Sequence, residues 1–199
     1  MKYITHTIGK FGSGHIDTQS KNLMIICNDT DCINRVYKSE NATKLTPFGR
    51  GWSLNIPKSK QGDMVFEDGK LTKFIDVRGT CYGFFYYSGF LRNISTPRGM
   101  ISYDYNADGM LTRVVYPDGS GAHICYRDVY YMHDICVCDS EGNGKVAVSY
   151  ADSHYSNGVG CVYEYFYDKN ERIEKRFTEV LEGSHMLTLT NQNDIILSK

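Results

Sequence analysis

The chain has 199 residues, a formal net charge of −1 and a sequence pI near 6.6. This length is typical of one domain with a continuous apolar core. The near-neutral charge gives no overall attraction to nucleic acid or to an anionic membrane, so we expect neither as a partner. The 16 tyrosines and 19 glycines, against only four prolines, favour β-strands joined by many turns.

The N-terminal sequence shows no basic stretch followed by an apolar export segment. The longest early apolar run, residues 23–27, is too short to span a bilayer. We therefore expect a cytoplasmic protein with no membrane partner. The seven cysteines are odd in number and irregularly spaced, which favours reduced, partly buried thiols over a set of disulfides.

Residues 1–60 are interpreted as an N-terminal segment that contains a Phe-Gly-x-Gly-Trp turn. The glycine-rich stretch at residues 9–14 lacks the Lys-Ser or Lys-Thr ending of a phosphate-binding loop, so we interpret it as a turn. Gly49 and Gly51 permit a tight backbone turn just before Trp52, the sole tryptophan. We expect Trp52 to be a structural residue that packs in the core.

Residues 61–127 are predicted to form tandem 20-residue β repeats. The hexapeptides GKLTKF, GFLRNI and GMLTRV begin at Gly69, Gly89 and Gly109, and another glycine follows each start after ten residues. Each unit is expected to hold two strands and two turns, with glycine at positive φ in the turns. Strict alternation places Leu71 on the same side as Lys73, and the equivalent Leu111 on the same side as Arg113.

Aromatic residues lie between these turns, among them Tyr103 and Tyr105. We expect them to pack structurally in cross-strand ladders, and a sugar- or base-stacking platform is the less favoured interpretation. Residues 128–199 are expected to be an irregular segment followed by closing β-hairpins, since alternation resumes at residues 161–167 and again at 172–180. The three segments are expected to form one structural domain.

Five potential metal ligands lie between residues 123 and 138: His123, Cys125, His133, Cys136 and Cys138. Residues two positions apart in a strand lie on the same face, as His123 and Cys125 would, and Cys136 and Cys138. Two adjacent strands could therefore present these side chains together as zinc ligands. The spacing matches no known zinc signature, and small buried thiols explain the same pattern. We therefore predict no metal, no cofactor and no catalytic residue, and keep these five as the candidates if a metal is bound.

Three residues could take the catalytic roles of a thiol hydrolase: Cys161 as the nucleophile, His154 as the base and Asp152 as the carboxylate that orients the base. Nothing in the sequence fixes their proximity, and Asp152 and His154 lie in a polar stretch that is typical of a loop. An enzyme that uses these cysteines and histidines is therefore the alternative we favour least.

The sequence YDYNADGMLTRVVYPDG at residues 103–119 resembles the tyrosine-aspartate (YD) repeat of the Rhs family. Residues 165–173 resemble a second copy and residues 85–91 a degenerate one. Upstream, Arg35 and Tyr37 followed by the Phe-Gly-x-Gly-Trp turn resemble the region that leads into an Rhs repeat array. The resemblance thus covers roughly residues 15–180.

In large Rhs proteins, such repeats form a spiralling β shell around a toxic C-terminal segment. The resemblance therefore implies an all-β fold, a meander of antiparallel β-hairpins in a curved, YD-repeat-like sheet or partial barrel. This chain is too short to close such a shell, and it has no aspartate-proline-x-glycine segment like the family's cleavage region. The resemblance hence implies architecture more firmly than activity.

We predict a non-enzymatic interaction or shell protein that is related to Rhs-type polymorphic toxin systems and acts by protein–protein contact. Its partner would be a toxin, a further repeat shell or a second copy of the chain. An immunity- or antitoxin-like role and a phage accessory role are alternatives that the sequence does not separate.

Overall fold

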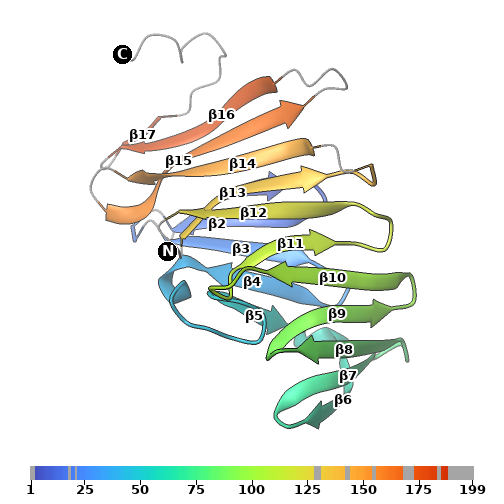
Figure 1. Ribbon diagram of the computed structural model, residues 1–199. Coiled ribbons are helices and arrows are strands. Elements are labelled where there is room, and N and C mark those ends of the chain that lie inside the picture. Colours follow the sequence, from blue (N-terminus) through green and yellow to red (C-terminus); the bar gives the residue numbers. More distant parts are fainter. Residues whose placement is uncertain are drawn as a thin grey trace.

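The computed structural model describes residues 3–17, 19–20, 22–127, 131–141, 144–153, 156–167, 173–182 and 185–187 (Figure 1). In these ranges the chain forms 17 β-strands, two short 3₁₀ helices (Ser39–Asn41 and Lys58–Lys60) and no α-helix. None of the helices in the described ranges is long and apolar enough to cross a membrane.

The strands form two antiparallel sheets. The first sheet contains β1 (Tyr3–Ile8), β2 (Gly12–Asp17), β3 (Leu23–Asn28), β4 (Asn34–Lys38) and β5 (Trp52–Asn55). The second contains β6 (Gln61–Glu67), β7 (Lys70–Asp76), β8 (Cys81–Tyr87), β9 (Phe90–Thr96), β10 (Gly99–Tyr105), β11 (Leu111–Val115), β12 (Gly121–Arg127), β13 (Tyr131–Cys138), β14 (Gly144–Ser153), β15 (Ser156–Tyr167), β16 (Ile173–Glu182) and β17 (His185–Leu187).

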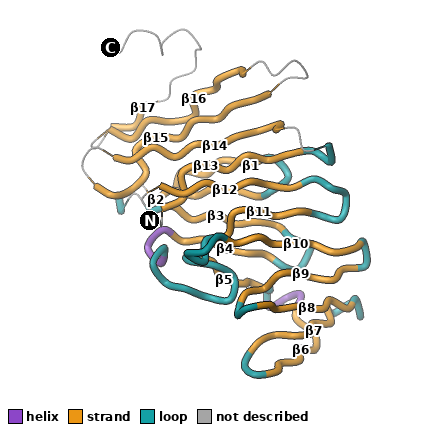
Figure 2. The backbone as a smooth tube through the Cα atoms, viewed as in Figure 1, coloured by secondary structure: helices purple, strands orange, loops and turns teal. Residues whose placement is uncertain are grey.

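Within each sheet, every strand pairs with the strand that precedes or follows it in the chain. Most of the connections are short loops (Figure 2). The predicted all-β meander of antiparallel hairpins is therefore confirmed. The proposed division of the chain at residues 60 and 127 stays a prediction, because strand pairing alone does not define a domain boundary.

The repeat glycines lie at the hairpin turns. All six have φ between +74° and +125°: Gly69, Gly79, Gly89, Gly99, Gly109 and Gly119. Residues with a Cβ are strained at such angles, so glycine is the residue that lets these turns close. This explains why the 20-residue period of the sequence becomes a period of two strands.

The prediction that Leu71 and Lys73 lie on the same face of β7 is wrong. The register of β7 against β6 leaves Thr72 as an extra residue between them, so the two side chains point to opposite faces. Leu71 is buried and Lys73 is exposed, while Phe74 is buried beside Leu71. The cause is a β-bulge, which breaks strict alternation at one position.

The same bulge recurs in the next two repeats, at Arg92 in β9 and Thr112 in β11. For this reason Leu111 and Val114 are both buried, and Arg113, predicted to share the side of Leu111, is exposed. Each repeat therefore contributes two apolar residues to the core from one strand, three positions apart.

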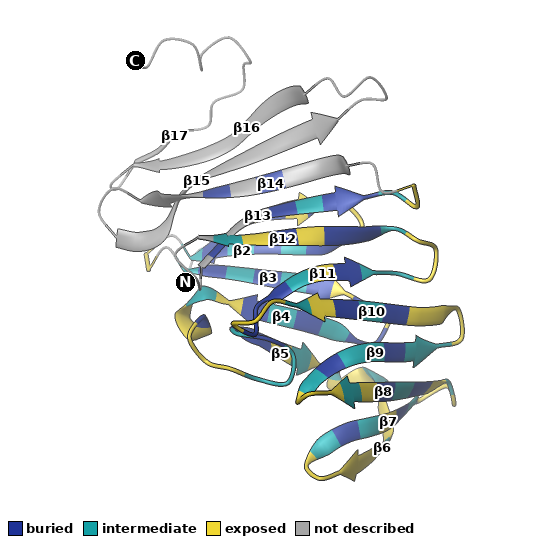
Figure 3. Cartoon of the chain, viewed as in Figure 1, coloured by how far each residue is buried: buried dark blue, intermediate teal, exposed yellow. Residues whose placement is uncertain are grey.

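The apolar core lies between the two sheets (Figure 3). Ile25 and Tyr37 of the first sheet and Leu91 and Val114 of the second are completely buried. The second sheet is longer, and its β6 end lies beyond β5 (Figure 1). Six of the seven residues of β6 are therefore exposed.

Replacement of two turn glycines separates backbone strain from packing. Gly69 and Gly51 have nearly equal φ, +74° and +75°. A Cβ at Gly69 would have no atom within 4 Å, whereas a Cβ at Gly51 would lie 2.6 Å from Cε2 of the completely buried Tyr37 ring. We expect Gly69→Ala to lower the free energy of unfolding by about 1 kcal/mol and Gly51→Ala by about 3 kcal/mol, measured in urea. Equal losses would contradict a packing contribution at Gly51.

Candidate functional site

A buried ion pair lies between the two sheets. The side chains of Arg35, on β4, and Asp29, in the turn before it, are 0% exposed. Arg35 Nε donates to Asp29 Oδ2 at 2.5 Å, and Nη2 donates to Oδ1 at 2.9 Å. From β10 of the other sheet, the Tyr103 hydroxyl donates to Asp29 Oδ2 at 2.9 Å. The carboxylate of Asp29 therefore joins both sheets through charge-assisted hydrogen bonds.

Aromatic rings enclose the guanidinium of Arg35. Its Cζ lies 4.5 Å from the centre of the Tyr103 ring and 5.2 Å from that of Trp52. Trp52 Nε1 donates to the Tyr126 hydroxyl at 3.0 Å, and that hydroxyl donates to the Leu111 carbonyl at 2.8 Å. We call Asp29, Arg35, Trp52, Tyr103 and Tyr126 the Arg35 cluster.

Arg35 and Tyr103 keep their protonation states near neutral pH. Burial is the largest single effect on the Arg35 pKa and lowers it, but the charges of Asp29 and Tyr103 and the hydrogen bond to Asp29 together outweigh burial and raise that pKa. Burial, and then the charge of Asp29, raise the pKa of Tyr103. Neither side chain exchanges a proton near neutral pH, so the geometry fits a structural cross-link between the sheets better than acid–base catalysis.

Asp29 and Arg35 were not among the site residues predicted from the sequence. One sequence signal for Arg35 was available. Ile33 and Tyr37, two residues before and two residues after Arg35, are both buried, so strand alternation places the charged Arg35 side chain at an inward position. The expected core position of Trp52 agrees with its 1% exposure. Its role as a cover for a buried arginine was not visible in the sequence.

Tyr103 and Tyr105 are covered by other parts of the protein. Tyr103 is 1% exposed. The ring of Tyr105 stacks on Phe90, with the ring centres 4.8 Å apart. These two rings are thus unavailable as the stacking platform for sugars or bases that was the less favoured interpretation.

A cavity of about 440 Å³ opens close to Asp29, where turns of both sheets meet. Its charged lining includes Lys10 and Arg98 but also Asp31 and Asp118. The hydroxyl of Tyr116, another lining residue, is buried without a hydrogen-bond partner among the described residues. Asp29 also lines the cavity, but its charge is paired with Arg35. The remaining two basic and two acidic residues balance, so the cavity shows no charge preference that would identify a ligand.

The predicted metal candidates lie on two paired strands. His123 and Cys125 are on β12, Cys136 and Cys138 are on β13, and His123 lies directly opposite Cys136. His133 is also on β13, but its side chain lies outside the described residues. The Cys138 thiol is buried and donates to the Cys136 carbonyl at 3.9 Å. Among the described side chains, no group of three or more His, Cys, Asp or Glu is placed to hold a metal ion.

The candidates for a thiol hydrolase lie outside what the structure describes. Asp152 and Cys161 are on β14 and β15, with undescribed side chains, and His154 is not described. Elsewhere, Cys27 and Cys32 are buried free thiols. Burial raises the pKa of Cys27, so this thiol is not an activated nucleophile.

His6 on β1 forms a second polar link between the sheets. Its Nε2 lies 2.8 Å from the Tyr150 hydroxyl on β14, while its Nδ1 is buried without a hydrogen-bond partner in the described part of the chain. Burial, and then the charge of His15, lower the His6 pKa from 6.5 to about 4. His6 is therefore neutral in the folded protein at neutral pH.

The lowered pKa predicts a loss of stability in acid. Because folding favours neutral His6, its contribution is complete above pH 6.5 and is lost as the pH falls toward 4. We expect His6→Gln to remove about 3 kcal/mol of the pH dependence of unfolding in this window. The control is His123→Gln, at an exposed histidine on β12. Urea unfolding at a series of pH values measures both, and an unchanged pH profile for His6→Gln would contradict the assignment.

Comparison with known proteins gives limited similarity. No protein-family model and no curated protein matches the chain. The chain is similar to a solved structure of the Photorhabdus luminescens Tc holotoxin pore that carries a TccC3 variant, with 13% identity and a TM-score of 0.42. It is also similar to a crystal structure of TcdB2-TccC3-Cdc42, with 14% identity and a TM-score of 0.34. Each match covers 80% of this chain but only 9% of the other chain.

Proposed function

We propose that the chain is a non-enzymatic β-repeat protein, related to Rhs-type polymorphic toxin systems, that acts by binding another protein. One observation carries the proposal: the large exposed apolar side chains concentrate at one end of the second sheet. Of the seven in the described part, six lie between residues 65 and 100: Val65, Phe66, Val77, Phe85, Tyr87 and Met100.

Four of these side chains belong to the outer face of the second sheet, away from the first sheet. Phe85 and Tyr87 are 53% and 72% exposed and alternate with the inward-facing Phe84 and Tyr86 along β8. Met100 and Val65, each 44% exposed, lie on nearby strands of the same sheet. We call Val65, Phe85, Tyr87 and Met100 the outer apolar face. Grouped exposed apolar residues of this kind mark protein interaction sites.

The remaining polar features support a scaffold rather than an enzyme. In the Arg35 cluster, both Asp29 oxygens already accept hydrogen bonds, and the Arg35 pKa is raised. Arg35 therefore stays charged, whereas a general acid or base needs a pKa near the working pH. The YD-like repeats at residues 103–119 and 165–173 supply the proposed relation to Rhs systems.

Affinity capture with an outer-face variant tests the proposal. We expect the tagged wild-type chain to retain a partner from a lysate of its source cells, and Phe85→Ser with Tyr87→Ser to lower recovery about tenfold. The control is Leu45→Ser, which truncates the exposed large apolar side chain that lies outside residues 65–100, in the loop before β5. A strictly monomeric wild-type chain that retains no protein, or equal recovery with the Phe85/Tyr87 variant, would contradict it.

A further inference from the structure

The edge strand β1 is held in the first sheet on one side only. Among the described strands it pairs with β2 alone. Its residues Thr5 and Thr7 are exposed, whereas His6 and Ile8 point inward and are buried. A strand at the edge of a sheet is among the parts of a fold that open most easily, because one row of main-chain hydrogen bonds holds it. β1 can therefore leave the sheet without breaking the pairing of the other strands.

His6 joins this edge strand to the second sheet. The residue is 6% exposed, and its Nε2 lies 2.8 Å from the Tyr150 hydroxyl on β14. The imidazole occupies space that Gly14 of β2 leaves open, because a Cβ at Gly14 would clash with His6 Nε2 and would lie 2.8 Å from the Tyr150 hydroxyl oxygen. Anything that expels the imidazole from this space therefore removes the polar link between β1 and β14.

The surroundings of His6 accept its neutral form only. A neutral imidazole carries one N–H group, whereas an imidazolium carries two N–H donors and a positive charge. Nδ1 is buried and has no hydrogen-bond partner in the described part of the chain, so a second N–H group would lack an acceptor. No carboxylate of the described ranges forms an ion pair with His6. A protonated His6 is thus more stable in water than in its buried position.

Two titratable groups act on His6 from the elements packed against it in the described structure. Tyr150, on β14, presents a hydroxyl that is uncharged in mild acid. His15, on β2, acts through its charge, which lowers the His6 pKa in addition to burial. Because His15 gains this charge as the pH falls, it adds to the effect of burial.

We propose that β1 is a flap that acid releases: protonation of His6 detaches β1 from β2 and from β14, while the other strands stay paired. The imidazolium moves into water and takes β1 with it. β2 then becomes the free edge of the first sheet, with main-chain groups that can pair with another strand.

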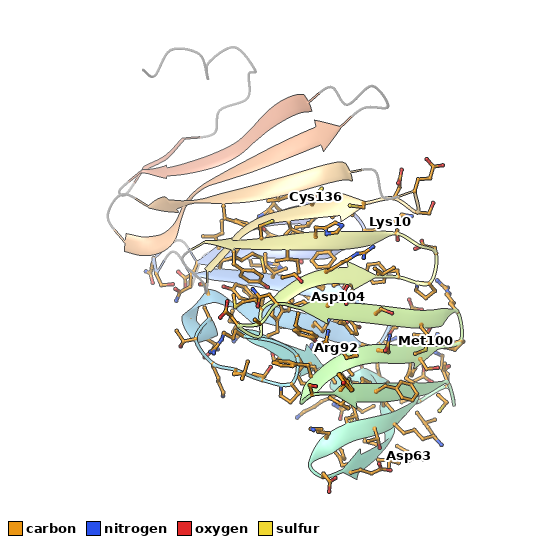
Figure 4. All side chains as sticks on the ribbon, in the orientation of Figure 1. Lys10, Asp63, Arg92, Met100, Asp104 and Cys136 are labelled. Atoms are coloured by element: carbon orange, nitrogen blue, oxygen red, sulfur yellow. The ribbon has the colours of Figure 1, made fainter. Side chains whose placement is uncertain are left out.

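The flap is separate from the surface proposed to bind a partner. Met100 of the outer apolar face lies on β10, and β11, β12 and β13 separate it from Tyr150 on β14 (Figure 4). The release of β1 is therefore an additional property of the chain, and its test does not depend on the outer apolar face.

The size of the effect follows from the proton that the open form binds. The His6 pKa is about 4 with β1 in place, and it returns to about 6.5 when the imidazole reaches water. Between these values the open form is protonated and the closed form is not. We expect a change from pH 7 to pH 5 to shift the opening equilibrium of β1 about twentyfold toward the open form.

Hydrogen–deuterium exchange of the full chain, read by mass spectrometry, tests the flap. Labelling at pH 7 and at pH 5 uses times that match the intrinsic exchange of an unfolded chain. Exchange of β1, relative to this intrinsic rate, is expected to rise about twentyfold at pH 5, while that of β4 stays unchanged. We expect His6→Gln to abolish the rise, and the control His123→Gln, at an exposed histidine on β12, to keep it.

Two further variants separate protonation from a simple loss of packing. Gly14→Ala fills the space of the imidazole, so β1 is expected to exchange rapidly at pH 7 and to change little at pH 5. Ile8→Ala removes a completely buried side chain of β1 but leaves His6 in place. It is expected to speed exchange of β1 at both pH values and to keep the roughly twentyfold ratio between them.

Three results would overturn the proposal. The first is equal exchange of β1 at pH 5 and pH 7 in the wild-type chain. The second is a pH response of His6→Gln as large as that of His123→Gln. The third is an increase in β4 exchange that equals the increase in β1, because acid would then unfold the whole chain instead of releasing one strand.

Discussion

Asp29→Asn is expected to lower the free energy of unfolding by about 3–5 kcal/mol, the range for a buried ion pair that loses one partner. The substitution keeps the size of the side chain but leaves the Arg35 charge buried without its counter-ion. It also weakens the hydrogen bond that the Tyr103 hydroxyl donates from the other sheet. Urea unfolding followed by circular dichroism measures the loss.

Asp31→Asn is the matched control, because Asp31 lies two residues away with a side chain that is 76% exposed. Its ion pair with Arg78, at 4.0 Å, is expected to contribute less than about 1 kcal/mol. A double variant, Asp29→Asn with Arg35→Met, is expected to recover part of the stability, since no buried charge then lacks a partner. If Asp29→Asn cost no more than Asp31→Asn, the Arg35 cluster would not be the link between the sheets.

Trp52→Ala is expected to cost about 3–5 kcal/mol through the cavity that it leaves in the core. Trp52 is 1% exposed, and its ring lies 5.5 Å from that of Tyr37 and 5.2 Å from Arg35 Cζ. Its loss removes packing from both sheets and uncovers one face of the guanidinium. The measurement is again by circular dichroism, because the substitution removes the sole tryptophan.

Two further variants separate the parts of this effect. Trp52→Phe keeps an aromatic ring over Arg35 but loses the hydrogen bond to the Tyr126 hydroxyl, so we expect a smaller cost of about 1–3 kcal/mol. Phe85→Ala truncates an aromatic side chain that is 53% exposed, and its expected cost is below about 1 kcal/mol. A Trp52→Ala loss as small as that of Phe85→Ala would rule out the central packing role of Trp52.

The sequence predicted the fold class because its signals are local. A turn glycine at positive φ and a run of alternating residues act over a few positions, so the 20-residue period from Gly69 to Gly109 was enough to indicate paired strands. Side-chain direction was less predictable, because one extra residue, such as Thr72, shifts the remaining positions of a strand to the other face. The signals for the bulge, Leu71 and Phe74 three positions apart, are visible only in retrospect.

The candidate sites depend on contacts between distant residues. Asp29 and Tyr103 are 74 positions apart and come from different sheets, so no local pattern reveals their hydrogen bond. The exposure of Phe66 likewise depends on where β5 stops relative to β6, which is set by how the sheets pack. The cysteines and histidines at residues 123–138 were conspicuous in the sequence, but their contacts depend on strand register.

By itself, the sequence determined an antiparallel β meander with turns at the repeat glycines, since turn geometry and strand alternation are properties of neighbouring residues. Only the tertiary structure decided which charges are buried and which apolar side chains are left uncovered. The physical reason is that burial depends on the sheet that lies opposite: Arg35 is enclosed because β10 faces it, and Phe66 is exposed because the first sheet ends before reaching it.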